Sequence, residues 1–362
     1  MKFIDEFRNE VIAKKLIQQM SRISLENINI MEVCGTHTMA LFKYGIPELL
    51  PKGVRIISGP GCPVCVTSAD YIESAIEISH VKNVIILSFG DMLKVTSNEN
   101  GSLLKRKSQG GDIRMIYSPM DALKIAADNP LKKVVFLSVG FEPTTSIIAV
   151  AVIEAYKQNI NNLFFLTSNK ITTSALKELF KDKETNIQGF LLPGHVSTII
   201  GEKSYNFLQN DFKIPSVIAG FELLDLLQGI NTLLLLIVKN KALVINEYKR
   251  AVKREGNIIA LNYINEVFKV IDCNWRGIGM IPSSGYALNE KYEKFDALKH
   301  FNIEEKIYEE KTGCICGEIL KGIKTPSDCK LFGSICTEEN PIGPCMVSSE
   351  GTCAAHFKYS IG

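Results

Sequence analysis

The shortest stretch with recognisable chemistry is GPGCPVC, in which a proline and a valine separate Cys62 from Cys65. Two thiols at this spacing can ligate a metal ion or form a reversible disulfide, and a nearby helix N-terminus lowers a thiol pKa. A zinc knuckle needs a second such pair, and none lies nearby. We therefore predict a redox or transient metal-handling pair, with a structural metal site and two incidental thiols as the alternatives.

A second thiol motif, VCGTHT, places Cys34 and His37 three residues apart. One turn of helix would put the thiolate and the imidazole on one face, which suits iron, zinc or a histidine-activated nucleophile. Taken alone, the motif fits equally well a buried cysteine that packs as a small hydrophobe beside a histidine bonded to the backbone.

Three further polar residues follow glycine-bearing turns, namely Asp91, Glu142 and His195. Each alone suits a helix cap or a turn, because acidic residues favour the first turn of a helix. Only their convergence on a thiol motif would indicate a ligand site.

Six of the ten cysteines lie near the end of the sequence, at positions 314, 316, 329, 336, 345 and 353. Their intervals lack the paired C-x-x-C of a zinc ribbon and are typical of a loop-rich iron–sulfur site. Four thiolates suffice for a cubane cluster, and the remaining two could form a disulfide beside it. A structural zinc site is the alternative, and Cys273 is assigned no role.

The elements that must position these motifs alternate between short apolar runs and helical patterns from about residue 28 to residue 220, as in βαβ units. The fold class is therefore α/β, with parallel sheets whose strand ends carry the motifs, since ligands bind outside the carboxyl ends of such strands. The predicted strands are Ile28–Val33, Val54–Ser58, Val84–Ser88, Ile113–Tyr117, Val134–Val139, Leu163–Thr167, Gly189–Leu192 and Ser216–Ala219.

An echo between VIILSFG and VVFLSVG indicates two halves, which we divide near Pro130 because a helix stops before a proline. We predict two Rossmann-like domains, at 1–129 and 130–238, and a mainly helical, loop-rich cluster domain at 239–362. The N-terminal helix could pack on this third domain. The apolar run Leu233–Val238 belongs to a buried helix, because polar residues interrupt it well short of the ~20 apolar residues that a membrane span needs.

The amino-acid composition says little about which classes of molecule the protein binds. Lys and Arg number 41 against 39 Asp and Glu, so the net charge of +2 gives no argument for nucleic acid or an anionic membrane surface. The first residues, MKFIDEFRNE, lack the basic and apolar regions of a secretory signal. We expect a cytoplasmic protein that binds neither nucleic acid nor membrane.

Eight motifs, in order and across essentially the whole chain, resemble those of the HypD-type hydrogenase maturation factors. They are VCGTHT, ISGPGCPVC, SFGDMLKV, YSPMDAL, VGFEPTT, LLPGHVS, WRGIGMIPSSGY and CMVSSEGTCAAHFKY. The resemblance implies a role in assembling the Fe(CN)₂CO unit of [NiFe]-hydrogenases, with a HypC-type small chaperone and a HypE-type protein that delivers cyanide. GFEPTT and GFELLDLL depart from the usual family pattern.

Carried over by motif, the resemblance implies that Cys34 holds the iron, shared with a cysteine of the small chaperone, and that His37 tunes or orients it. Cys62 and Cys65 are then the redox pair beside that iron.

The resemblance also places His195 and Glu350 at polar positions near the working cleft. In the tail it implies a disulfide beside a [4Fe–4S] cluster, as in ferredoxin:thioredoxin reductases. The cluster ligands are then Cys314, Cys329, Cys336 and Cys353, and the extra pair is Cys316 and Cys345.

The resulting hypothesis is a scaffold on which iron at Cys34 receives its ligands while electrons pass through Cys316/Cys345 to Cys62/Cys65. One alternative is an iron–sulfur-dependent thiol–disulfide reductase acting through Cys62/Cys65. Another is a zinc-stabilised binding module without redox activity.

Overall fold

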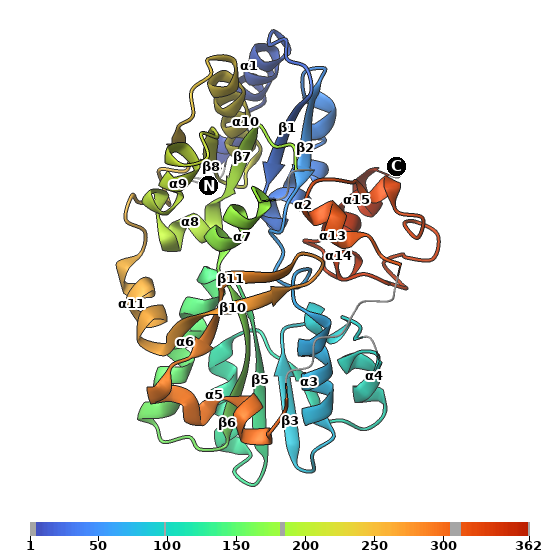
Figure 1. Cartoon of the computed structure of the whole chain (residues 1–362), viewed down its shortest axis with the longest axis vertical. Helices are drawn as coiled ribbons and strands as arrows, with labels where there is room; N and C mark the ends of the chain where they lie inside the picture. Colours follow the sequence, from blue (N-terminus) through green and yellow to red (C-terminus); the bar gives the residue numbers. More distant parts are fainter. Residues whose placement is uncertain (1–4, 98, 182–184, 305–312, 361–362) are drawn as a thin grey trace.

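All eight runs predicted as strands are strands in the computed structural model of the chain, which describes residues 5–97, 99–181, 185–304 and 313–360. The predicted parallel α/β architecture is confirmed. Among the described residues, the strands form two sheets, stacked one above the other along the long axis of the molecule (Figure 1).

Sheet A is parallel throughout, and its strands lie in the order β2-β1-β7-β8-β9. Their bounds are β1 (Ile28–Glu32), β2 (Val54–Ser58), β7 (Gly189–Pro193), β8 (Ser216–Ala219) and β9 (Val244–Asn246).

Sheet B has the order β10-β11-β6-β5-β3-β4 and is parallel from β6 to β4, whereas β10 and β11 are antiparallel additions at one edge. The bounds are β3 (Val84–Ser88), β4 (Ile113–Met115), β5 (Lys133–Gly140), β6 (Leu163–Lys170), β10 (Phe268–Trp275) and β11 (Gly279–Leu288).

Helices cover both faces of each sheet because successive strand residues point to opposite faces. We call the part of the molecule built around sheet A lobe A, and the part built around sheet B lobe B. In lobe A, Ile30 faces α1 and α10, whereas its neighbour Met31 faces α7, α8 and the cysteine-rich tail. The helices of this lobe are α1 (Glu10–Ser21), α2 (Gly35–Lys43), α7 (Thr172–Leu179), α8 (Gly194–Ile200), α9 (Asn206–Asn210) and α10 (Leu223–Val238).

Lobe B repeats this arrangement, with Ile85 facing α5 and α6 while Ile86 faces α3. Its helices are α3 (Ala69–Ser79), α4 (Leu103–Ser108), α5 (Pro119–Asp128), α6 (Glu142–Lys157), α11 (Ile258–Val267) and α12 (Ala297–Phe301). The tail, drawn in red at the side of Figure 1, contains α13 (Cys316–Leu320), α14 (Pro344–Val347) and α15 (Thr352–Ser360).

Taken in chain order, the described strands change from one sheet to the other three times: after β2, after β6 and after β9. The division predicted near residue 129 therefore does not separate the sheets, because each sheet contains strands from both sides of it. Nor do residues 239–362 form one helical domain: β9 completes sheet A, and β10 and β11 extend sheet B. Helix α1 packs on α10, not on the tail.

Helix α10 forms where the spacing of its leucines predicts it, and Leu226, Leu227 and Ile230 are fully buried. Its N-cap is a capping box in which the Glu222 and Asp225 side chains each accept a backbone N–H. No helix in the described part of the chain is long and apolar enough to cross a membrane.

Candidate functional site

Cys34 occupies the junction between strand β1 and helix α2, where it is the N-cap residue and is 7% exposed. Its backbone N–H donates a 2.9 Å hydrogen bond to Glu32 Oε2, and the Thr38 hydroxyl donates to the other oxygen of that carboxylate. Glu32 thereby fastens the first turn of α2 to the end of β1. The Cys34 thiol stands at a rigid corner of the fold.

The GPGCPVC loop packs directly on this corner. Gly35 N–H donates a 3.0 Å hydrogen bond to the carbonyl oxygen of Gly61. A Cβ atom on Gly61 would overlap the backbone of Cys34, with its Cα only 2.6 Å away, so glycine is required by this close approach. Two thiol motifs from neighbouring strands are thus in backbone contact.

Cys62 and Cys65 form a disulfide in this structure, on the first crossover between the lobes. Both residues are buried, and the Cys65 Sγ atom lies 3.9 Å from the carbonyl oxygen of Pro344. Pro344 precedes Cys345 at the start of α14, so the predicted redox pair meets the tail beside one of its cysteines.

Glu350 brings the tail onto α2. The Thr36 hydroxyl donates a 2.7 Å hydrogen bond to Glu350 Oε1. A Cβ on Gly35 would lie 2.5 Å from the Cβ of Glu350 and 2.6 Å from its carbonyl oxygen. The glycine after Cys34 therefore makes room for this glutamate, which lies beside the CGTHT motif.

Asp91 is connected to the same region by hydrogen bonds of tail residues. The Ser348 hydroxyl donates a 3.0 Å hydrogen bond to Asp91 Oδ2 and accepts a 3.3 Å bond from the backbone N–H of Glu350. The FGD motif after β3 of lobe B is therefore linked to the CGTHT motif of lobe A by two residues of the SSEG segment.

His37 and His195 both contact one aromatic ring. The His37 ring centroid is 4.8 Å from that of Phe221, which stacks on His195 at 4.0 Å. His37 is fully buried, and its Nε2 atom is 3.0 Å from the Gly220 carbonyl oxygen, so Nε2 carries the proton. Among the described residues, His37 Nδ1 has no hydrogen-bond partner.

The electrostatics of the site favour protonated Cys34 and neutral histidines. Burial raises the pKa of the Cys34 thiol to about 12, and the Glu350 and Glu32 carboxylates add to this. Burial also raises the pKa of Glu32 to about 7. It lowers the pKa of His37 to about 4, and that of His195 as well, although the Glu350 charge opposes the latter shift.

The six tail cysteines lie near one another. The thiols of Cys314 and Cys345 lie close enough to Cys316 to shift its pKa. Burial raises the pKa of Cys353. The charges of four further tail cysteines raise it more, namely those of Cys314, Cys316, Cys336 and Cys329. Cys353 thus lies within electrostatic reach of all three of its predicted fellow ligands.

The donors that the tail offers are thiols, which are the ligands of iron–sulfur clusters. No three His, Cys, Asp or Glu side chains among the described residues are placed to hold one metal ion. A cubane cluster is much wider than an ion, so its thiolates stand further apart. Four buried or half-buried thiols around Cys353, in a segment made mainly of loops, fit such a cluster.

Glu142, which was singled out from the sequence, does not join the site, and neither does Cys273, to which no role was assigned. Glu142 is buried at the start of α6, where its carboxylate accepts hydrogen bonds from the backbone N–H and the hydroxyl of Thr172 at 2.9 and 2.8 Å. Its role is to join α6 to α7. Cys273 lies on β10 and contacts Lys170 instead.

Sequence reasoning missed three residues of the site, namely Glu32, Phe221 and Ser348. Glu32 had a usable signal, because a carboxylate within the apolar run INIMEV must be buried and therefore needs donors nearby. Phe221 and Ser348 had none, since only the folded chain brings them beside His37 and Asp91.

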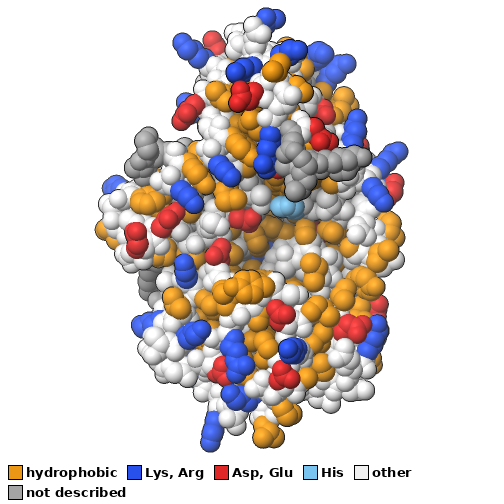
Figure 2. Space-filling view, turned by 180° about the vertical axis from the view of Figure 1, so that it is seen from behind, with side chains coloured by type: hydrophobic (Ala, Val, Ile, Leu, Met, Phe, Trp, Pro, Cys, Tyr) orange, Lys and Arg blue, Asp and Glu red, His pale blue; other side chains and the backbone are white. Residues whose placement is uncertain are grey.

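Seen from the opposite side, the molecular surface is hollowed between the two lobes, and a histidine side chain lies at the upper rim of the hollow (Figure 2). Apolar side chains gather below it, over lobe B.

The chain is similar to known proteins over nearly all its length. A family model named HypD, described as "Hydrogenase formation hypA family", matches residues 11–360. Hydrogenase maturation factor HypD2 of Bradyrhizobium diazoefficiens is 43% identical over 368 residues, covering 99% of this chain and 97% of that protein.

Two other relatives agree. Hydrogenase maturation factor HypD of Escherichia coli is 42% identical over 367 residues, covering 99% of this chain and 98% of that protein. HypD of Cupriavidus necator is 41% identical over 368 residues, covering 99% and 97%. With a matching family model and relatives of this identity along its whole length, the chain belongs to the HypD family of hydrogenase maturation factors.

Proposed function

We propose that this protein is a redox-active scaffold on which the Fe(CN)₂CO unit of [NiFe]-hydrogenase is assembled. The observation that carries the proposal is the meeting of three chain segments at Cys34. Gly61 packs on the backbone of Cys34, and Glu350 from the tail packs on Gly35. A thiol suited to iron is thereby placed beside a disulfide and a cysteine-rich tail.

The iron is cargo, and Cys34 is its proposed ligand, shared with a cysteine of a HypC-type small chaperone. Since burial holds the Cys34 thiol protonated, iron must displace its proton on binding. His37, fixed through Nε2 to the Gly220 carbonyl, presents a neutral imidazole and orients this corner of the fold. A HypE-type protein delivers cyanide to the iron, at a site that we place in the cytoplasm.

The tail supplies the redox partner. Cys314, Cys329, Cys336 and Cys353 are the proposed ligands of a [4Fe–4S] cluster, which when bound would supply electrons to neighbouring thiols.

Cys316 and Cys345, whose thiols are close enough to influence each other's pKa, are the proposed extra thiol pair. The contact between Cys65 and Pro344 brings this pair and Cys62/Cys65 to adjacent positions, so that exchange between them needs only a local rearrangement.

The alternative, a thiol–disulfide reductase that acts on a protein substrate through Cys62/Cys65, finds less support. Cys62 is 4% exposed and Cys65 is fully buried, so a protein disulfide would reach neither sulfur without movement of the tail. A buried pair beside Cys34 is better suited to serve a site within the protein.

The test is an infrared spectrum of the protein co-purified anaerobically with its small chaperone. We expect cyanide and carbon monoxide stretches in the wild type, their loss in Cys34→Ala, and their retention in Cys273→Ala, a matched control in lobe B. The visible absorbance of the tail cluster should persist in both variants. Bands that survive in Cys34→Ala would exclude Cys34 as the iron ligand.

A wild type without bands, but with a cluster and with Cys62/Cys65 cycling between thiol and disulfide, would instead support the reductase. Zinc without inorganic sulfide in metal analysis would exclude both redox functions and leave a binding module.

A further inference from the structure

The hairpin of β10 and β11 extends well beyond sheet B. Among the described residues, β11 pairs with β6 only at Gly285 and Tyr286, whereas β10 and β11 stay paired with each other up to the turn that joins them. Figure 1 shows the hairpin running across the middle of the molecule, between the lobes, to the cysteine-rich tail. We call its outer part, residues 273–281, the hairpin arm, and the end of this part, residues 275–279, the arm tip.

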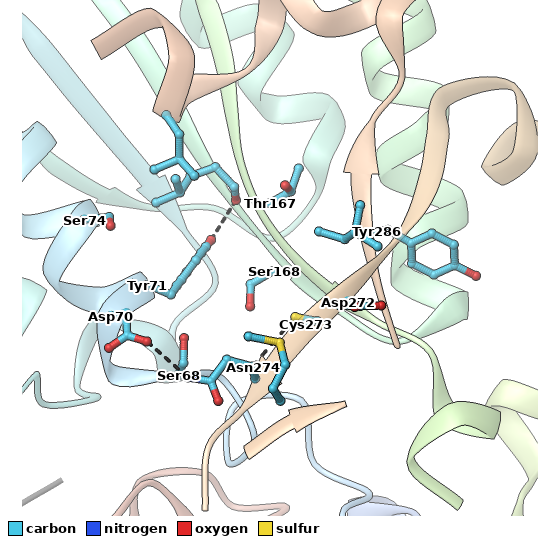
Figure 3. Close-up of a pocket in the computed structure, with 14 residues that line it drawn as sticks. Ser68, Asp70, Tyr71, Ser74, Thr167, Ser168, Asp272, Cys273, Asn274 and Tyr286 are labelled. Atoms are coloured by element: carbon cyan, nitrogen blue, oxygen red, sulfur yellow. Dashed lines mark hydrogen bonds between the residues drawn. The ribbon is translucent and has the colours of Figure 1, made fainter. Parts of the chain in front are cut away.

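The arm is anchored near its base and borders a cavity. Lys170, the last residue of β6, is 1% exposed, and its Nζ atom lies 3.1 Å from the Cys273 sulfur and 3.0 Å from the Asn274 carbonyl oxygen. A cavity of about 240 Å³ lies between the arm, α3 and β6, and Figure 3 shows Cys273 and Asn274 at its wall. The position of the arm tip therefore depends on the contacts that the tip itself makes.

On one side, the arm tip pairs with the chain directly after Cys65. The Arg276 backbone N–H donates a 3.0 Å hydrogen bond to the Val66 carbonyl oxygen, and Trp275 forms an antiparallel bridge with Thr67. Trp275 is fully buried in the same apolar cluster as Cys65 and Val66. The arm tip is thus joined to the disulfide loop through its backbone.

On the other side, the arm tip meets the residue directly after Cys316. A Cβ atom on Gly277 would lie 2.6 Å from the Gly317 Cα atom, and one on Gly317 would lie 2.2 Å from the Gly277 carbonyl oxygen. Two glycines therefore face each other, and a larger residue at either position must move the arm tip away from α13.

The arm tip is therefore joined to the neighbours of both thiol pairs. The pairs approach each other at Cys65, whose Sγ atom lies 3.9 Å from the carbonyl oxygen of Pro344, the residue before Cys345. Groups held on one rigid support react as if each were present at high concentration, and a displacement of about 1 Å can cost about a hundredfold in rate.

We propose that the contact of Gly277 with Gly317 sets how closely the tail thiol pair approaches the disulfide of the GPGCPVC loop. This inference rests on the proposed function, in which the two pairs exchange. Neither glycine supplies a reacting atom, so both are positioning residues.

The exchange that they position is balanced within the chain. The Cys345 thiolate attacks the Cys65 sulfur, the bond between Cys62 and Cys65 breaks, and a mixed disulfide forms. The Cys316 thiolate then attacks the Cys345 sulfur, which closes the tail disulfide and releases Cys65. The loop disulfide is the oxidant: it gains two electrons, and the two protons lost by the tail pair pass to Cys62 and Cys65.

The experiment traps the mixed disulfide in the full-length protein. In the parent variant, Cys62→Ser with Cys316→Ser, only Cys65 and Cys345 remain of the two pairs. The protein is equilibrated anaerobically in glutathione buffers of graded thiol-to-disulfide ratio, quenched with acid, alkylated and analysed by peptide mass spectrometry. The fraction with a disulfide between Cys65 and Cys345 gives the effective concentration of one thiol at the other. We expect a value above the ~mM range of a flexible tether.

Three glycine variants of this parent test the arm tip. Gly277→Ala and Gly317→Ala add a methyl group to the contact from either side, and each should lower the effective concentration about tenfold or more. Gly279→Ala is the matched control: its φ of +104° is also left-handed, but no described atom lies within 4 Å of its Cβ position. It should keep the effective concentration of the parent, and the alkylation rates of Cys65 and Cys345 should be the same in all variants.

Three outcomes would overturn the proposal and leave the exchange intact: parent-like values in Gly277→Ala and Gly317→Ala, an equal fall in Gly279→Ala, or faster alkylation of both thiols, which would mean general loosening of the tail. If circular dichroism shows that Gly277→Ala is unfolded, Gly317→Ala decides. A parent without any disulfide between Cys65 and Cys345 would instead overturn the exchange itself, and this inference with it. Because no readout involves the bound iron, the result is independent of the infrared test.

Discussion

The Thr36 hydroxyl donates a 2.7 Å hydrogen bond to the Glu350 carboxylate across 314 residues of sequence. This bond joins the residue two places after Cys34 to the residue three places before Cys353. It holds the cysteine-rich tail against helix α2, whose N-cap is Cys34. A substitution on one side of this bond should therefore affect the residues on the other side.

The first prediction concerns the charge of Glu350. The Glu350 carboxylate raises the pKa of Cys34, so Glu350→Gln should lower that pKa and increase the thiolate fraction. We expect Cys34 to react with iodoacetamide about threefold faster at a fixed alkaline pH, measured by peptide mass spectrometry. Thr36→Val is the control, since it removes the hydrogen bond but keeps the charge. Equal acceleration in both variants would indicate loosening of the tail instead.

The second prediction concerns Gly61. A methyl group at this position would overlap the backbone of Cys34, which cannot yield as a side chain can. Gly61→Ala should lower the free energy of unfolding by about 1–3 kcal/mol. Urea unfolding followed by the fluorescence of Trp275, the single tryptophan, measures it. Gly90→Ala is the control, because its nearest neighbour is the Met115 sulfur at 3.1 Å; equal stability of the two variants would contradict the prediction.

The third prediction concerns the ion pair of Arg250 and Asp225, whose hydrogen bonds are 2.6 and 2.5 Å. Asp225 also accepts the backbone N–H of Glu222, next to the segment whose Gly220 carbonyl accepts from His37. Arg250→Met leaves a buried carboxylate unpaired and should cost about 3 kcal/mol of unfolding free energy. Adding Asp225→Asn should recover part of this loss. A double variant no more stable than the single one would show that the charge is not the cause.

The fourth prediction is a pH dependence carried by Glu142. Burial raises its pKa to about 7 in the folded protein, from 4.5 in the unfolded chain. The folded state therefore binds more protons between these values, and its stability falls as pH rises from 4.5 to 7 and then levels off. Each pH unit of the interval is worth at most about 1.4 kcal/mol.

Glu142→Gln cannot ionise and should lack this component. Urea denaturation at several pH values measures the unfolding free energy of both proteins. As pH rises from 4.5 to 7, the wild type should lose stability relative to the variant. A difference that does not change with pH would mean that Glu142 keeps its ordinary pKa.

The strands of the two sheets were predictable because each is a short apolar run bounded by polar turns, as Val54–Ser58 and Val84–Ser88 are. Strands β10 and β11 were missed. FKVIDCNW mixes charged and apolar residues, and GMIPSSGYAL contains a proline and two glycines. These compositions are tolerated because β10 is the edge strand of sheet B, β11 is next to it, and much of their length is exposed.

The division into domains was wrong for a different physical reason. Which strand pairs with which depends on contacts between distant residues, such as Glu32 beside Leu191, and no local pattern encodes these contacts. The candidate site was more accessible to prediction, since Cys34, Cys62 and His195 are uncommon residue types directly after strands. Their supporting contacts, such as those of Phe221 with both His37 and His195, come only from tertiary packing.

The threefold crossing between the lobes also sets an order of assembly during synthesis. Sheet A waits for its third strand until β7 has left the ribosome, by which time the β3, β4, β5 and β6 strands of sheet B have all emerged. Its first two strands, β1 and β2, cannot bury a core alone. The GPGCPVC crossover is therefore synthesised early, but it is buried only after the tail has been synthesised. Until then, its two thiols are accessible to oxidants and reductants.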